Sequence, residues 1–94
     1  MIWKELGTTG VSIPEVGMAT SNYRAGPEPL RRGLQAGALF IDTAESYGTE
    51  PTVVDAIYGV GERVFLATKV SPQNFRSDAL RRSVESYLLF ASLD

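Results

Sequence analysis

The apolar residues of this chain follow a repeated order, in which a short compact run precedes a stretch of apolar residues at helical spacing. Compact runs of this kind are typical of strands that are covered on both faces, as in parallel sheets. The runs that predict strands cover residues 16–20, 39–41 and 64–70. Because a helical pattern follows each of them, the sequence predicts three successive strand–helix units.

The helical patterns carry start and stop signals of their own. The first predicted helix begins at Pro27 and is ended by Gly37 as its C-cap. The second covers residues 49–58, and the third has Ser77 as its N-cap. The residues expected to face the core are Leu30 and Leu34 in the first helix, Val53, Val54, Ile57 and Tyr58 in the second, and Leu80, Val84, Tyr87, Leu88 and Ala91 in the third.

A turn signal stands near the start of the chain. Gly7 and Gly10 enclose two threonines between runs rich in apolar residues, and glycine readily adopts the positive φ of a tight turn. A β-hairpin is therefore predicted. The expected organisation is one domain, with the hairpin over residues 1–14 and the three strand–helix units over residues 16–94.

Alternating strands and helices favour a parallel sheet with right-handed crossovers. Both a doubly wound sheet and a (β/α)8, or TIM, barrel satisfy this pattern. Such a barrel usually needs about 250 residues, so the 94 residues of this chain would supply less than half of one. A small margin of stability is expected at this length.

Composition narrows the classes of function. Hydrophobic residues make up 44% of the chain, charged residues 21%, and the net charge is -2, as in ordinary globular proteins. The Lys and Arg residues are scattered, which argues against a nucleic-acid partner. The chain contains no Cys and no His, which excludes disulfides, thiolate catalysis and the common zinc sites, so no metal site is predicted.

The chain lacks the signals that direct a protein into or across a membrane. The first five residues include two charges where a signal peptide would be apolar, and no run approaches the roughly 20 apolar residues of a membrane span. A cytoplasmic location without a membrane partner is the expectation.

Three side chains of complementary chemistry are expected where the parallel strands end. Asp42 ends the second predicted strand, Tyr47 follows in the next loop, and Lys69 lies near the end of the third strand. A tyrosine protonates a carbonyl oxygen during hydride transfer only if its pKa is lowered, and a nearby ammonium does this by stabilising the phenolate. Asp42 would hold Lys69 in place and keep it charged.

Each of these residues also has a purely structural interpretation. Asp42 could accept hydrogen bonds from loop N–H groups, Tyr47 could be an ordinary loop aromatic, and Lys69 could extend from the strand end into solvent. Taken singly, the structural interpretation is favoured for Asp42 and Tyr47, and the two interpretations are balanced for Lys69. Taken together, the three favour function, because three independent accidents would have to meet on one rim.

These residues lie in segments that resemble the aldo-keto reductases over nearly the whole chain. The residues LGTTG at 6–10 resemble the opening hairpin of that family. The residues FIDTAESYG at 40–48 resemble the signature around its catalytic Asp and Tyr, and VFLATKV at 64–70 resembles the segment with its catalytic Lys. The resemblance implies reduction of a small aldehyde or ketone with NADPH, less often NADH, at the C-terminal mouth of a (β/α)8 barrel.

The resemblance also implies catalytic roles. Tyr47 would be the general acid, Lys69 the partner that lowers its pKa, and Asp42 the residue that orients Lys69. Asp42 would in addition contact the cofactor, and Tyr47 the substrate.

The loop after the first predicted strand would complete the site. Ala19 and Thr20 are expected to contact the cofactor, and Ser21 the substrate. The family usually has Gly-x-Gly-Thr followed by an aromatic residue here, so Ala19 replaces a glycine and Ser21 replaces an aromatic wall.

The family's fourth strand carries a catalytic His, and these 94 residues include none. We therefore expect the N-terminal segment of an aldo-keto reductase that catalyses little by itself. One alternative is a non-catalytic module that self-associates through open strand edges and a surface around Leu89 and Leu93. Another is an α/β domain that binds phosphate or a metal ion, which the lack of a P-loop and of a carboxylate cluster disfavours.

Overall fold

The computed structural model describes residues 1–91, with the side chains of the last helix described as far as Ser86. The strands are β1 (Trp3–Glu5), β2 (Ser12–Pro14), β3 (Met18–Ala19), β4 (Phe40–Asp42) and β5 (Phe65–Ala67), and the α-helices are α1 (Pro27–Gln35), α2 (Glu50–Ile57) and α3 (Ser77–Ala91). Single turns of 3₁₀-helix lie in the connections at η1 (Glu45–Tyr47), η2 (Gly61–Arg63) and η3 (Pro72–Asn74). After β3, helices and strands alternate as predicted.

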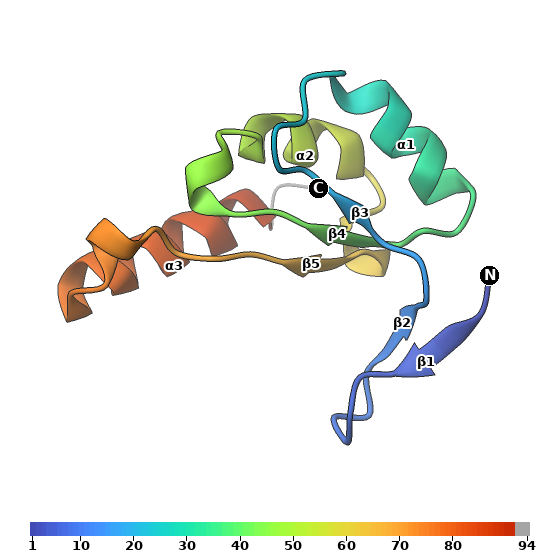
Figure 1. Cartoon of the computed structure of the whole chain (residues 1–94), viewed down its shortest axis with the longest axis horizontal. Coiled ribbons are helices and arrows are strands. Elements are labelled where there is room, and N and C mark those ends of the chain that lie inside the picture. The colour runs from blue at the N-terminus through green and yellow to red at the C-terminus, as the bar shows by residue number, and fades with distance from the viewer. Residues whose placement is uncertain (92–94) are drawn as a thin grey trace.

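The chain opens with an antiparallel hairpin of β1 and β2, in which Trp3 pairs with Pro14. The turn uses Gly7 at φ 57° and Gly10 at φ 78°, backbone angles that L side chains adopt only with strain. The hairpin forms a sheet of its own and lies beyond the N-terminal end of β3, on the side opposite the C-terminal ends of the parallel strands (Figure 1).

The strands β3, β4 and β5 form a parallel sheet in chain order, with Met18 opposite Ile41 and Ile41 opposite Leu66. The predicted α/β fold, a partial barrel with a hairpin and parallel strand–helix units, is confirmed in these features. Within residues 1–91 the sheet stays open and does not close into a barrel. The sheet therefore keeps two edges, at β3 and at β5.

The core lies between the sheet and the helices α1 and α2, which pack against each other over one sheet face (Figure 1). Ile41 at its centre has no exposed surface. Burying a side chain of this size contributes about 1.5–3 kcal/mol. The buried cluster consists of Leu30, Leu34, Ile41, Val53, Ala56 and Ile57.

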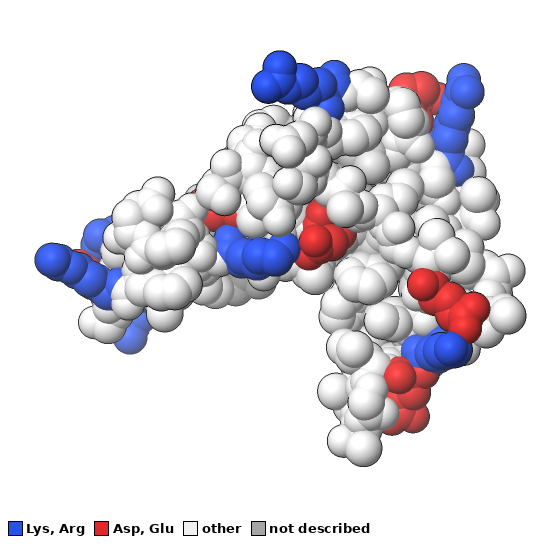
Figure 2. Space-filling view, in the orientation of Figure 1, with Lys and Arg blue, Asp and Glu red and all other residues white. Residues whose placement is uncertain are grey.

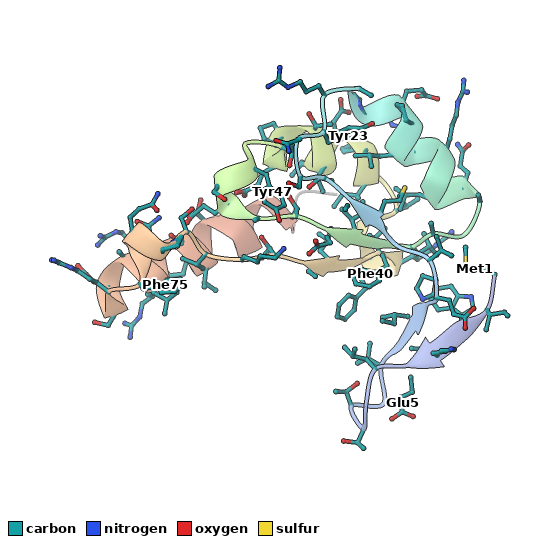
Figure 3. All side chains as sticks on the ribbon, in the orientation of Figure 1. Met1, Glu5, Tyr23, Phe40, Tyr47 and Phe75 are labelled. Carbon is teal, nitrogen blue, oxygen red and sulfur yellow. The ribbon has the colours of Figure 1, made fainter. Side chains whose placement is uncertain are left out.

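The opposite face of the sheet carries the aromatic pair of Phe40 and Phe65. Their rings meet edge to face, with centroids 5.5 Å apart, and both residues are only half-buried. Phe40 points away from α1 and α2, into the space between the sheet and the hairpin (Figure 3). None of the helices in the described part of the chain covers this face.

The structure corrects three of the predicted core positions. Tyr58 is 73% exposed, because α2 ends at Ile57 and the chain then turns to an extended backbone. Leu80 and Val84 are also exposed, because the first turns of α3 lie beyond the end of the sheet, where the helix packs mainly against η3 (Figure 1). The predicted strand over residues 64–70 is shorter than expected, and α3 begins at Ser77 itself instead of after it.

Some predictions fall outside the described side chains. These are the core positions Tyr87, Leu88 and Ala91 and the surface positions Leu89 and Leu93. Over the part of the chain that the structure describes, no helix combines the length and apolarity required to cross a membrane. The charged side chains are spread over the visible face in small groups, with no large area of one sign (Figure 2).

Candidate active site

The parallel sheet places Asp42 and Lys69 on the same edge. Asp42 is the last residue of β4, and Lys69 follows two residues after the end of the neighbouring strand β5. The chain after β4 makes one 3₁₀ turn, η1, and Tyr47 is its last residue. Gly48 follows at φ 69°, a left-handed conformation that lets the chain reverse into α2.

The side chains of Asp42, Tyr47 and Lys69 converge at this edge of the sheet, which is called the rim below. The Lys69 Nζ donates to Asp42 Oδ1 over 2.8 Å and to the Thr43 carbonyl over 3.0 Å. The same nitrogen lies 5.2 Å from the centroid of the Tyr47 ring, within the range of a cation–π contact. The structure therefore brings Asp42, Tyr47 and Lys69 together. Tyr47 extends from η1 near the C-terminal ends of the strands (Figure 3).

The rim is open to solvent. The Lys69 side chain is 54% exposed and that of Asp42 is 42% exposed. The hydrogen bond from Asp42 is the main cause that raises the pKa of the Lys69 ammonium; desolvation opposes the rise, and Tyr47 adds to it. Because an exposed ion pair stabilises a fold only weakly, the arrangement matters more for the charge it holds beside the Tyr47 ring than for stability.

The end of β3 adds two exposed residues to this edge of the sheet. Ala19 ends β3 opposite Asp42 in the sheet register and is exposed, as is Ser21 in the following loop. Both can therefore be contacted by a ligand at the rim.

Comparisons with known proteins agree with this architecture. No protein-family model matches the chain. Methylglyoxal reductase YeaE of Escherichia coli is 40% identical over 74 residues, which are 68% of this chain and 26% of that protein. The crystal structure of a thermostable aldo-keto reductase with the inhibitor epalrestat aligns with 100% of this chain and 40% of its own, at 36% identity and a TM-score of 0.85.

Two further structures carry the same likeness. A putative 2,5-diketo-D-gluconic acid reductase B aligns with 87% of this chain and 31% of its own, at 36% identity and a TM-score of 0.74. An aldo/keto reductase from Brucella melitensis aligns with 93% of this chain and 35% of its own, at 26% identity and a TM-score of 0.73. The chain belongs to the aldo-keto reductase family. It spans about a quarter of the length of its curated relative.

The structure places Thr20, a residue expected to contact the cofactor, inside the protein. Thr20 has no exposed surface, and its hydroxyl donates to the Asp42 carbonyl over 3.1 Å. Its backbone N–H donates to the same carbonyl, and its own carbonyl accepts from Tyr23. All polar groups of Thr20 are therefore engaged in hydrogen bonds inside the protein.

Thr20 belongs to a buried chain of hydroxyls that the sequence analysis missed. The Thr49 hydroxyl donates to the Thr20 hydroxyl over 3.1 Å, and it lies 3.3 Å from the hydroxyl of Thr43. These residues come from the ends of β3 and β4 and from the start of α2, so the chain ties three loops of the rim together. Single threonines between strand and helix carry no signal that distinguishes such a role.

Glu45 is a second residue that was missed. Its Oε1 accepts hydrogen bonds from the Ser71 N–H and from Asn74 Nδ2, each over 2.9 Å. The Ser71 bond is the largest cause that lowers the pKa of Glu45 to about 2, with Asn74 next. The only sequence signal was its place within the DTAE segment at 42–45.

A cleft of about 390 Å³ adjoins the rim between the start of α2, the loop after β5 and α3. Burial raises the pKa of the Glu50 carboxyl in this cleft, and the nearby charge of Glu45 adds to the effect. No group of three or more acidic side chains within residues 1–91 is arranged to hold a metal ion. The side chains that line the cleft include Glu45, Glu50, Pro51, Lys69, Ser83 and Val84.

Proposed function

We propose that this chain forms the N-terminal part of an NAD(P)H-dependent reductase of aldehydes and ketones, with Tyr47 as its general acid. The observation that supports the proposal most is the position of the Lys69 ammonium, which Asp42 and the Thr43 carbonyl hold beside the Tyr47 ring. A phenol beside an ammonium that a carboxylate holds in place can act as a general acid toward a carbonyl oxygen.

Tyr47, Lys69 and Asp42 would each have a separate role in the reduction. NADPH, when bound, supplies a hydride to the carbonyl carbon. The Tyr47 hydroxyl gives its proton to the carbonyl oxygen, and the Lys69 cation stabilises the phenolate that remains. Asp42 keeps Lys69 charged and fixed, since its hydrogen bond is the main cause of the raised Lys69 pKa.

We expect Ala19 and Asp42 to contact the nicotinamide end of such a cofactor. Ala19 and Asp42 lie opposite each other at the ends of β3 and β4 and offer an exposed methyl group and a partly exposed carboxylate. Ser21 and Tyr47 would contact the carbonyl substrate. The family resemblance favours NADPH as the cofactor, with NADH as the alternative.

The experiment supplies the missing part of a barrel in trans. The chain is co-expressed with the C-terminal portion of a homologous aldo-keto reductase, and NADPH oxidation is followed by absorbance. Methylglyoxal serves as the first carbonyl probe because the curated relative is a methylglyoxal reductase. We expect oxidation that depends on both parts and on the carbonyl, with little from this chain alone.

A matched pair of lysine variants tests the assigned role. The chain contains two lysines, Lys4 in the hairpin and Lys69 at the rim. We expect Lys69→Met to lower kcat by about 10²-fold or more, since it removes the stabilising cation, and Lys4→Met to leave it within about twofold. Equal activities of the two variants would contradict the proposed site.

A second candidate function is association through the uncovered surfaces. The chain exposes 6245 Å², whereas a compact monomer of 10.2 kDa exposes about 5,300 Å². The excess of about 900 Å² is close to the roughly 800 Å² that each partner buries in a standard interface. Trp3, Leu6 and Val16 are among the exposed apolar residues. Light scattering measures the molar mass in solution. A dimer would favour association as the function, and a monodisperse monomer would refute it.

A further inference from the structure

Glu45 joins the two loops of the candidate active site at the point where Lys69 lies. Its backbone N–H donates to the Lys69 carbonyl over 2.9 Å. Its side-chain Oε1 accepts from the Ser71 N–H and from Asn74 Nδ2. One residue of the first loop therefore holds the second loop on both sides of Val70, and Lys69 is at one end of the held stretch.

The strand register explains why a side-chain acceptor is needed there. The pairing of β4 with β5 continues past the strand ends, with Thr43 N–H donating to the Ala67 carbonyl and Glu45 N–H to the Lys69 carbonyl. In a regular parallel ladder the Ser71 N–H would next donate to the backbone carbonyl of Glu45. Because the chain turns into η1 at Glu45, its side-chain oxygen takes that hydrogen bond instead.

We propose that Glu45 is a positioning residue, which fixes the backbone at Lys69 so that the ammonium stays between Asp42 and Tyr47. This inference rests on the proposed function, because Lys69 belongs to that site. An exposed ion pair on a long side chain constrains its own geometry weakly, and the Lys69 side chain is 54% exposed. Where the backbone is held therefore decides where the ammonium can lie.

The charge of Glu45 suits this task. Hydrogen bonds to an ionised acceptor are shorter and stronger than those between neutral groups. The Ser71 and Asn74 donors keep the pKa of Glu45 at about 2, so the carboxylate stays ionised at every pH at which an enzyme of this kind would work.

Three substitutions separate geometry from charge. Glu45→Ala removes the acceptor and the charge together. Glu45→Gln removes the charge and keeps a carbonyl oxygen, which can accept both hydrogen bonds because both reach the single atom Oε1 in the structure. Glu62→Ala removes the same charge from an exposed position in η2 and serves as the control.

Nuclear magnetic resonance reads the position of Lys69 directly in the full chain. With two lysines in the sequence, the methylene protons next to each Nζ are easily assigned. The Tyr47 ring current should shift those of Lys69 upfield from those of Lys4, because the Nζ lies over the ring. Hydrogen exchange of the Ser71 amide reports the Glu45 hydrogen bond in the same samples.

In Glu45→Ala we expect the Lys69 signals to move toward those of Lys4 and the Ser71 amide to exchange about tenfold faster. Glu45→Gln should keep most of the upfield shift, and Glu62→Ala all of it. Unchanged Lys69 signals in Glu45→Ala would overturn the proposal. So would a Glu45→Gln spectrum like that of Glu45→Ala, because the effect would then come from charge alone.

A fourth variant keeps the test valid if Glu45→Ala loses its helical circular dichroism. Asn74→Ala removes one of the two hydrogen bonds to Oε1 and is expected to shift the Lys69 signals part of the way. Full retention of the shift would count against the positioning role. Neither readout uses carbonyl reduction, so this inference and the proposed function can fail separately.

Discussion

At the scale of single residues, Glu45 makes the stability of the fold depend on pH in a way that can be measured. Its pKa lies at about 2 in the fold, against an ordinary value of 4.5, chiefly because the Ser71 N–H donates to the ionised form. A folded-state pKa below the unfolded one adds stability that is fully present above pH 4.5 and is lost as the pH falls toward 2.

We therefore predict that the free energy of unfolding of the wild-type chain falls between pH 4.5 and about 2 more steeply than that of Glu45→Gln. Urea titrations at several pH values measure both. Glu62→Gln should keep the wild-type slope. Parallel pH profiles for wild type and Glu45→Gln would show that these hydrogen bonds do not form in solution.

At the scale of elements, the sequence predicts most helices and strands but not which of their faces are covered. The hairpin, the parallel strands and the helices α1 and α2 were predictable, because apolar periodicity and glycine turns reflect interactions within each element. Tyr58, Leu80 and Val84 were not, because their exposure depends on where α2 ends and on the direction of α3. Periodicity shows that a helix has an apolar face but cannot show whether another element covers it.

The candidate site likewise has features that the sequence predicts and features that it does not. The meeting of Asp42 with Lys69 follows from neighbouring parallel strands, which sequence can predict. The hydrogen bonds of the Thr20 hydroxyl do not, because they depend on where Thr43 and Thr49 lie in the fold. Its role emerges only from a hydrogen-bond chain that joins residues 29 positions apart.

The buried threonine chain should therefore stabilise the way in which β3, β4 and α2 meet. Thr20→Val keeps the shape of the side chain and removes two hydrogen bonds, the one to the Asp42 carbonyl and the one from the Thr49 hydroxyl. Each hydrogen bond contributes about 0.5–1.5 kcal/mol, so chemical denaturation should show a loss of about 1–3 kcal/mol. Ser21→Ala, at an exposed position in the same loop, should change stability by less than about 0.5 kcal/mol. Equal effects would exclude a special role for the Thr20 hydroxyl.

At the scale of the whole molecule, the sheet presents one covered face and one open face. The radius of gyration, 13.6 Å, exceeds the roughly 12.4 Å of a compact domain of this length, in keeping with the outlying hairpin and α3 (Figure 1). Phe40 and Phe65 lie on the open face, on the same side of β4 as Asp42 by strand alternation. Covering that face would therefore also enclose the candidate site.

The central claim is that Tyr47 donates the proton when a barrel is completed around this rim. The most direct measurement compares carbonyl-dependent NADPH oxidation by Tyr47→Phe and Tyr58→Phe, each co-expressed with the C-terminal portion of a homologous barrel. Each variant loses one phenol hydroxyl, but Tyr58 is 73% exposed at the end of α2 and lies outside the hydrogen-bonded rim. We predict that Tyr47→Phe lowers kcat by about 10²- to 10⁴-fold, the usual contribution of a general acid, and that Tyr58→Phe leaves it unchanged. Activity of Tyr47→Phe equal to that of Tyr58→Phe would contradict the assignment.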